Sequence, residues 1–323
     1  MSKILKSLLI TLKEMDVNSV QSMDPNDLFV KYGLEDAVEK AISMEYQRAL
    51  ASPWNVIKEI FAPGWRGWEE LPGADLVHEL IDWHNGFVKD NSNKPYFPTL
   101  QGGNFLTSGE LDLEQLRKVF LMMFASADAT APAPAFGVGK AHVDNQRELR
   151  DILLWHSYDE ISHVEMLKNF GINALGFTEE QINEAANELF PKVFDTPPIQ
   201  NLSKSINNKE EMLWVSSLIC RDGPLALVGC IMFSERENYG AHRKVVPALQ
   251  KHYGFPIETL AFFTAHTYID IFHERLGIYL IAKYCTTNSL KDLCMKYFQG
   301  MKIGSLEGLK LIYENNFEIV SNI

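Results

Sequence analysis

Histidine and aspartate side chains stand close together in the segment FFTAHTYIDIFHE, which covers positions 262 to 274. His266, Asp270 and His273 occupy positions i, i+4 and i+7 of a run otherwise rich in Phe, Ile, Ala and Thr. On one α-helix, which turns by about 100° per residue, these side chains fall within an arc of roughly 60°. Burying three such groups unpaired would cost several kcal/mol. The spacing therefore predicts that they bind one another, a metal ion or water.

Two further segments carry residues of the same types. LLWHSYDEISHVEMLKNFG contains Glu160 and His163, which are three residues apart and adjacent on a helix face, and IMFSERENYG places Glu235 beside an apolar run. Three helices would then supply three carboxylates and three imidazoles. Such a set suits two first-row transition-metal ions, because carboxylates can bridge the ions while imidazoles occupy terminal positions. With two Fe(II), three carboxylates leave a formal charge of about +1, which accommodates an anionic substrate or reduced dioxygen.

Two neighbours of these residues have the right chemistry but a less certain position. His156 precedes Glu160 by four residues, and we expect it to orient Glu160 from behind or simply to pack, rather than to bind metal. Glu237 follows Glu235 by two residues, which places it about 160° away around a helix. Only one of these two glutamates can therefore face the centre, and the expectation that it is Glu235 rests partly on the family resemblance described below.

The elements that must position these residues are helices. Apolar residues recur at spacings of three and four, and no sustained two-residue alternation appears, so an all-α fold is predicted. Helices are expected at residues 34–51, 53–61, 73–89, 111–127, 142–170, 257–286, 289–301 and 305–318. Thr178 and Gln181 form a capping-box pattern at the start of one more. The segment ATAPAPAFGVGK should interrupt the helix before it, and Asp222-Gly223-Pro224 should kink or split the apolar stretch at 209–239.

A loop rich in Asn, Pro and Gly, NSNKPYFPTLQGGN near residues 90–104, is the best candidate domain boundary. It predicts one portion at 1–104 and a second at 105–323. The helix before this loop also carries pairs of acidic and histidine residues, which we expect to form a solvated face: Asp75 with His78, and Asp82 with His84.

Composition excludes several classes of function. The chain has 323 residues, a formal net charge of -12 and no run of Lys or Arg, which argues against a nucleic-acid partner. The opening segment MSKILKSLLITLKEM has too short an apolar run for a signal peptide or a membrane span, so we expect a cytoplasmic protein with no membrane partner. The four cysteines show no CxxC spacing and are predicted to be reduced core thiols: Cys220, Cys230, Cys285 and Cys294.

Over about residues 112–290 the sequence resembles the heme-oxygenase-like diiron oxidases and oxygenases, which are related in fold to thiaminase-type and pyrroloquinoline-quinone synthase-type proteins. The segments that carry the resemblance are DEISHVEMLKNFGINALG, SERENYGAHRKVVPALQKHYG and HTYIDIFH. It implies a heme-oxygenase-like helical bundle at 105–323. Residues 1–104 would be an N-terminal helical extension that packs on the bundle or builds a homodimer. The resemblance also implies the ligands of two iron ions: Glu160, His163, Glu235, His266, Asp270 and His273.

The activity implied by the resemblance is that of a non-heme diiron enzyme with dioxygen as cosubstrate. Such an enzyme would oxidise a small amino-acid-like or fatty-acid-like molecule by N-oxygenation, desaturation or oxidative C–C cleavage, as in natural product biosynthesis. It would need an external electron donor and no catalytic residue beyond the metal ligands. The short spacing between Glu160 and His163 is similar to that of the fatty-acid-decarboxylating branch.

Three other interpretations stay open. In a ferritin-like diiron protein, Glu160 with His163 and Asp270 with His273 would be two E-x-x-H-type motifs, and His266 would point away from the metals. A metal-free enzyme or binding protein of the thiaminase type would use the same side chains as general acids or bases. A structural helical protein would pair them in a satisfied core network.

Overall fold

The chain folds as a bundle of helices in the computed structural model, which confirms the all-α prediction. The structure describes residues 34–99, 102–193 and 235–315, together with positions 4, 225, 229 and 231–233. In these residues the only strands are Pro98–Thr99 (β1) and Gly102–Gly103 (β2), which form a two-residue antiparallel pair in the predicted loop. The expected kink at 222–224, and with it Cys220 and Cys230, lies outside the described residues.

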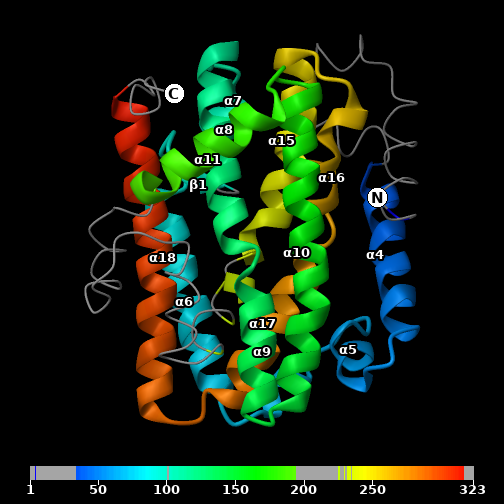
Figure 1. Cartoon of the computed structure of the whole chain (residues 1–323). Helices are drawn as coiled ribbons and strands as arrows, with labels where there is room; N and C mark the ends of the chain where they lie inside the picture. The colour runs from blue at the N-terminus through cyan, green and yellow to red at the C-terminus, as the bar shows by residue number, and fades with distance from the viewer. Residues whose placement is uncertain are drawn as a thin grey trace.

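Figure 1 shows the described helices in chain order from blue to red. Their bounds are Leu34–Leu50 (α4), Asn55–Ile60 (α5), Gly67–Glu70 (η1), Ala74–Asn91 (α6), Phe105–Ser108 (α7), Leu113–Thr130 (α8), Ala133–Val143 (α9), Arg147–Asn173 (α10), Glu179–Val193 (α11), Glu235–Glu237 (η2), Asn238–Tyr253 (α15), Ile257–Leu260 (η3), Ala261–His266 (α16), Asp270–Tyr284 (α17) and Asn288–Glu314 (α18). Figure 1 shows α10 and α18 running along the length of the bundle, with α4 standing at the side opposite α18.

Helix α10 is central to the packing, because it contacts α8, α9, α16 and α17. Near its C-terminal end, Phe170 meets Phe120, Phe255 and Phe263 edge-on, with ring centroids 5.1 to 5.9 Å apart. Edge-to-face pairs of this kind stabilise a core beyond the burial of their area. The aromatic cluster therefore fixes α16 against α10, and α16 carries His266.

The segment ATAPAPAFGVGK interrupts the helix before it, as expected, because α8 ends at Thr130 and α9 begins at Ala133. Helix α9 itself was not predicted. Pro132 and Pro134 fall at its start, where the missing N–H has no partner to lose. The predicted helices at 289–301 and 305–318 are one helix, α18. Gly304 lies inside α18 and is buried, so close packing outweighs the cost of about 1 kcal/mol that a helical glycine carries.

The N-terminal elements pack on helix α17. Phe61 stacks on Phe272, with ring centroids 4.5 Å apart, and Arg275 donates a hydrogen bond to the carbonyl oxygen of Ala62 at 3.1 Å. The backbone N–H of Gly73 donates to the carbonyl of Ala282 at 2.6 Å. These contacts place residues before the predicted boundary against the helix that carries Asp270 and His273. The division at 104/105 stays a prediction.

Helix α6 presents the expected solvated face with one exception. Asp75 is exposed and pairs with Lys291, and His78 and Asp82 are also exposed. His84 is buried and its ring lies 5.8 Å from that of Phe298, so its assignment to the solvated face was wrong. It continues the buried stripe of Leu76, Val77 and Leu80 at helical spacing.

Two local predictions agree with the structure. Thr178 Oγ1 accepts a hydrogen bond from the N–H of Gln181 at 3.2 Å, and Gln181 Oε1 accepts one from the N–H of Thr178 at 2.9 Å, which together form the capping box. Cys285 and Cys294 are buried free thiols in the core.

One stretch, Leu113–Val143, is long and apolar enough to cross a membrane by length and composition. Some 65% of its most apolar window is buried inside the bundle. A core helix of a soluble protein gives the same pattern, so this stretch is weak evidence for a membrane span. The cytoplasmic location stays a prediction.

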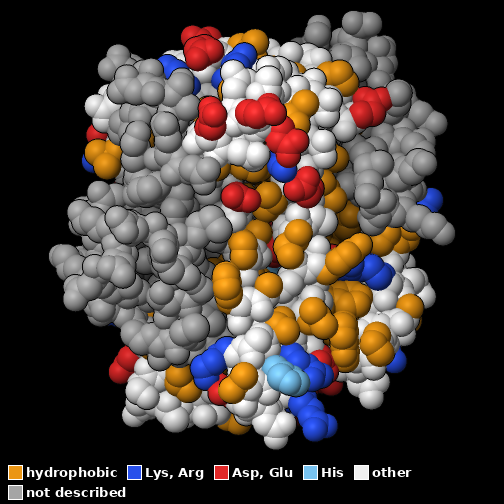
Figure 2. Space-filling model, in the orientation of Figure 1, with side chains coloured by type: hydrophobic (Ala, Val, Ile, Leu, Met, Phe, Trp, Pro, Cys, Tyr) orange, Lys and Arg blue, Asp and Glu red, His pale blue; other side chains and the backbone are white. Residues whose placement is uncertain are grey.

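One face of the molecule carries acidic side chains at one end and hydrophobic side chains in its middle. In Figure 2 acidic side chains gather at the upper end of the visible face, and hydrophobic side chains are exposed across its centre. The exposed large hydrophobic residues include Leu154, Tyr158 and Ile161, which stand at positions i, i+4 and i+7 of α10. The predicted homodimer and the absence of a nucleic-acid partner stay predictions.

Gly277 packs closely against the backbone of Gly229 and Phe233, and a substitution at Gly277 tests this packing. A Cβ atom at Gly277 would lie 2.4 Å from the backbone nitrogen of Phe233 and 2.9 Å from the carbonyl oxygen of Gly229. We expect Gly277→Ala to lower the free energy of unfolding by about 1–3 kcal/mol in urea denaturation, because backbone atoms must move apart. The control is Gly139→Ala in α9, where nothing lies within 4 Å of the added atom. Equal stability of the two variants would contradict this packing.

Candidate metal centre

The segment that carries His266, Asp270 and His273 is not one helix, so the prediction of a continuous helix over 257–286 was wrong. Helix α16 ends at His266, and helix α17 begins at Asp270. Between them the N–H of Tyr268 donates to the carbonyl of Ala265 at 3.2 Å, which makes a tight turn. The two helices nevertheless bring all three side chains to one region of the core, since Asp270 Oδ1 lies 4.0 Å from both His266 Nε2 and His273 Nδ1.

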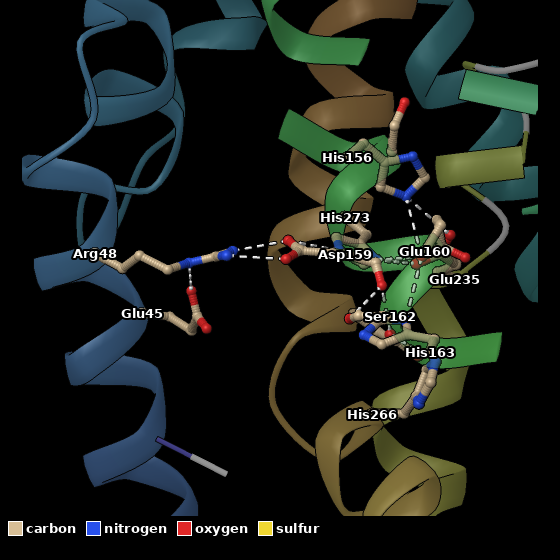
Figure 3. A network of polar contacts seen from close by, with 12 residues as sticks. Glu45, Arg48, His156, Asp159, Glu160, Ser162, His163, Glu235, His266 and His273 are labelled. Atoms are coloured by element: carbon tan, nitrogen blue, oxygen red, sulfur yellow. Dashed lines mark hydrogen bonds and ion pairs between the residues drawn. The ribbon is translucent and has the colours of Figure 1, made fainter. Parts of the chain in front are cut away.

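Helix α10 supplies three side chains with the same spacing. His156, Glu160 and His163 stand at positions i, i+4 and i+7 and lie on the side of α10 that faces α16 and α17 (Figure 3). Both histidines are buried. The fourth contributor is η2, a short 3-10 helix whose first residue is Glu235, also buried.

Four of these residues bring one possible ligand atom each to within 4.8 Å of one another: His156, Glu160, Glu235 and His273. Nδ1 of His273 lies 2.7 Å from Glu235 Oε2, and Nε2 of His156 lies 3.6 Å from Glu235 Oε1. Glu160 Oε1 is at the centre of the group, 3.4 Å from His156 Nε2 and 3.3 Å from His273 Nδ1. A single carboxylate oxygen is thus close to several imidazoles.

The remaining predicted residues adjoin this group. Nδ1 of His163 lies 3.4 Å from Glu160 Oε1, and the rings of His163 and His266 are 4.3 Å apart. Asp270 Oδ1 lies 4.0 Å from His266 Nε2 and 4.0 Å from His273 Nδ1. The structure therefore brings together all six residues that the sequence singled out.

His156 was expected to stand behind Glu160 or to pack, yet it lies among the same potential ligands. Its ring is fully buried and meets the ring of His273 edge-on at 4.4 Å. The i, i+4, i+7 spacing with Glu160 and His163 was the signal for this placement. The side chain of Glu237 lies outside what the structure describes, so the choice between it and Glu235 rests on the position of Glu235 alone.

The protonation of two histidines follows from their surroundings. Nδ1 of His266 donates to the carbonyl oxygen of Phe262 at 2.7 Å, which leaves Nε2 with a free lone pair on the side of Asp270. Burial lowers the pKa of His266 well below its usual value, so the ring stays neutral. Burial would also lower the pKa of His273, but the negative charges of Glu235 and Asp159 raise it well above the usual value.

The carboxylates are held ionised although they are buried. Burial would raise the pKa of Glu235, but the charge of His273 and the nearby ring of His156 lower it overall. Burial and the charge of Glu235 would raise the pKa of Glu160, and His163 with His156 lowers it overall. In the metal-free chain the negative charge of these carboxylates is stabilised by nearby histidines. A metal cation would stabilise that charge more strongly.

The residues present fit a pair of iron ions. Three carboxylates and four imidazoles meet in the core, and oxygen with imidazole nitrogen is the donor set that non-heme iron prefers. Neither ring nitrogen of His156 makes a hydrogen bond within the part of the chain that the structure describes. A buried ring with both nitrogens unpaired is costly, and coordination to a cation would remove that cost.

A salt bridge that no sequence pattern indicated lies directly behind the group. Asp159 faces α4, where Arg48 Nη1 and Nη2 donate to its two carboxylate oxygens at 2.9 and 2.7 Å. Arg48 Nε also donates to Glu45 Oε2 at 2.6 Å, and burial raises the pKa of Glu45 to about 7. Since Asp159 and Arg48 are 111 residues apart, no local pattern connects them.

Three basic residues near the centre in sequence have protein partners. Arg236 pairs with Glu274 at 2.7 Å, Arg275 donates to a backbone carbonyl in the turn after α5, and Lys283 pairs with Glu148 at 2.6 Å. Their cationic groups bind to other groups of the protein, so these residues give no support for a substrate-binding role.

The ferritin-like interpretation required His266 to point away from the other ligands. Its Nε2 instead faces Asp270, and its ring lies beside that of His163 (Figure 3). The observed direction disfavours the ferritin-like arrangement.

The protonation pattern can be measured on metal-free protein by NMR of ¹⁵N-labelled histidine. We expect His266 to stay neutral, with its proton on Nδ1, to a pH well below 6.5, because its folded-state pKa is lowered. His273 should keep both ring protons to a pH well above 6.5, because its pKa is raised. Titration of both rings near 6.5 would contradict the geometry described above.

One family of known proteins matches this chain. A model of the family described as iron-containing redox enzymes matches residues 118–303, which is more than half of the chain. No curated protein and no solved structure matches the chain. The matched residues include every potential ligand described above, from His156 to His273. The chain therefore belongs to the iron-containing redox enzyme family, an oxidoreductase family of heme-oxygenase-like fold.

Proposed function

We propose that this protein is a non-heme diiron enzyme that uses dioxygen to oxidise a small amino-acid-like or fatty-acid-like substrate. The observation that carries the proposal is the convergence of three carboxylates and four imidazoles, from α10, η2, α16 and α17, on one buried region. Membership in an iron-containing redox family supports iron as the metal.

Glu160 is the residue best placed to be shared between two ions. Its Oε1 atom lies 3.3 to 3.4 Å from a nitrogen of His156, His163 and His273. Carboxylates can bridge metal ions in this way, whereas imidazoles are terminal ligands. One ion would be held by His156, Glu235 and His273, and the other by His163, His266 and Asp270.

Two ferrous ions, when bound, would supply the electrons that reduce dioxygen, and an external donor would restore them. The side chains of the protein fix the ligands and limit access of water. Phe262, Phe263 and Phe272 are buried beside the ligands of α16 and α17. His266 stays neutral and so offers a lone pair without prior loss of a proton. Three ionised carboxylates would leave the pair of ions with a formal charge of about +1, which favours an anionic group on the substrate.

Iron analysis after anaerobic loading tests the proposal. We expect about two equivalents of iron in the wild-type chain, because the ligands divide into two sets. Asp270→Ala and His273→Ala should each lower the iron content and abolish oxygen consumption by the reduced protein, with helicity retained. Asp75→Ala, which removes an exposed carboxylate on α6, is the matched control and should have no effect on either measurement. Wild-type protein that retained less than about 0.3 equivalents would instead favour the metal-free class.

Iron should also stabilise the fold. The buried ring nitrogens of His156 make no hydrogen bond in the part of the chain that the structure describes, so cation binding favours the folded state. At a free-iron concentration of 100 times Kd, one site adds about 2.7 kcal/mol to the free energy of unfolding. We expect a rise in Tm on anaerobic iron loading of wild-type protein and a smaller rise in His266→Ala. A Tm that does not change with iron would argue against a metal site built from these residues.

A further inference from the structure

We propose that Asp159 and Arg48 form a positioning pair that orients His273 for metal binding, and that helix α4 is thereby a structural part of the metal centre. This inference rests on the proposed function, because it concerns one ligand of the proposed iron pair. It assigns a role to a helix that lies outside the part of the chain matched by the iron-containing redox enzymes.

The first step concerns the two nitrogens of His273. Nδ1 faces Glu235 Oε2 at 2.7 Å and Glu160 Oε1 at 3.3 Å, whereas Nε2 faces Asp159 Oδ2 at 3.6 Å (Figure 3). The edge of the ring that carries Nδ1 therefore points to the proposed ions, and the other edge points to a carboxylate. A ligand histidine is commonly fixed by a carboxylate at its second nitrogen, which sets the direction of the ring and raises its basicity.

The second step concerns what holds Asp159. Both of its oxygens accept hydrogen bonds from the guanidinium of Arg48, at 2.9 and 2.7 Å. A two-pronged contact between arginine and a carboxylate fixes the plane of the carboxylate as well as its position. Because Arg48 occupies both oxygens from the side of α4, Asp159 is placed as an outer support for His273 rather than as a metal ligand.

The third step concerns what holds Arg48. Its guanidinium lies over the ring of Trp155 at 4.3 Å, and its Nε donates to Glu45 Oε2 at 2.6 Å. Glu45 is buried and lies on the same helix as Arg48. Trp155 immediately precedes His156 on α10. Helix α4 therefore docks where α10 carries its potential ligands, and the guanidinium is held on three sides.

The test uses full-length protein titrated anaerobically with Co(II), whose visible spectrum reports ligand geometry. The variants are Asp159→Asn, Arg48→Met and the charge-retaining Arg48→Lys. The control is Arg66→Met, which removes an exposed ion pair with Glu69. Circular dichroism checks folding, and if Asp159→Asn does not fold, the two Arg48 variants decide the question.

We expect all variants to bind two equivalents of cobalt. In Asp159→Asn and Arg48→Met, one of the two ions should bind about 10- to 100-fold more weakly, with an altered spectrum, while the other ion is unaffected. Arg48→Lys should recover part of the affinity, because it keeps the charge but loses the two-pronged contact. Arg66→Met should match the wild type.

Two results would overturn the positioning pair. One is wild-type affinity and spectrum in both Asp159→Asn and Arg48→Met. The other is the loss of a whole equivalent in Asp159→Asn with no change in Arg48→Met, which would make Asp159 a metal ligand. Failure of the proposed function is distinguishable, because wild-type protein itself would then bind no cobalt, and the pair would have no ion to serve.

Discussion

The structure depends on placing ionised carboxylates and imidazoles in the middle of a helical core. Charges of this kind are costly to remove from water unless opposite charges lie within a few ångströms. Here the compensation comes from within the group, since Glu235 and Glu160 stay ionised beside His273, whose pKa is raised in return. The packing of α10, α16 and α17 maintains these distances, and four of the side chains come close enough together to hold a metal ion.

Much of the centre could be predicted from sequence because its ligands are carried at helical spacing. His156, Glu160 and His163 on α10 face one direction for the simple reason that positions i, i+4 and i+7 do so on any helix. His266, Asp270 and His273 follow the same spacing, although a turn separates the first from the other two. Despite that break the three side chains lie close together, with Asp270 Oδ1 4.0 Å from both His266 Nε2 and His273 Nδ1.

Other features depend on contacts that spacing cannot reveal. The burial of His84 follows from the approach of α18, and the helical state of the segment with two prolines after Thr130 follows from where those prolines fall. The salt bridge between Arg48 and Asp159 joins two helices far apart in the chain, and neither residue stands out locally. For His84 and for the salt bridge the deciding neighbour comes from another helix, and the spacing of residues along the chain does not show which helices lie side by side.

The indole of Trp155 gives this protein an internal optical reporter. Its ring lies beneath the guanidinium of Arg48 and meets Trp54 and Phe61 edge-on, at 6.2 and 5.8 Å between centroids. Tryptophan emission responds to a nearby charge and is quenched by neighbouring open-shell metal ions. The difference in fluorescence between the wild type and Trp155→Phe isolates the signal of this one position. It would follow both the docking of helix α4 and the binding of metal in a single experiment.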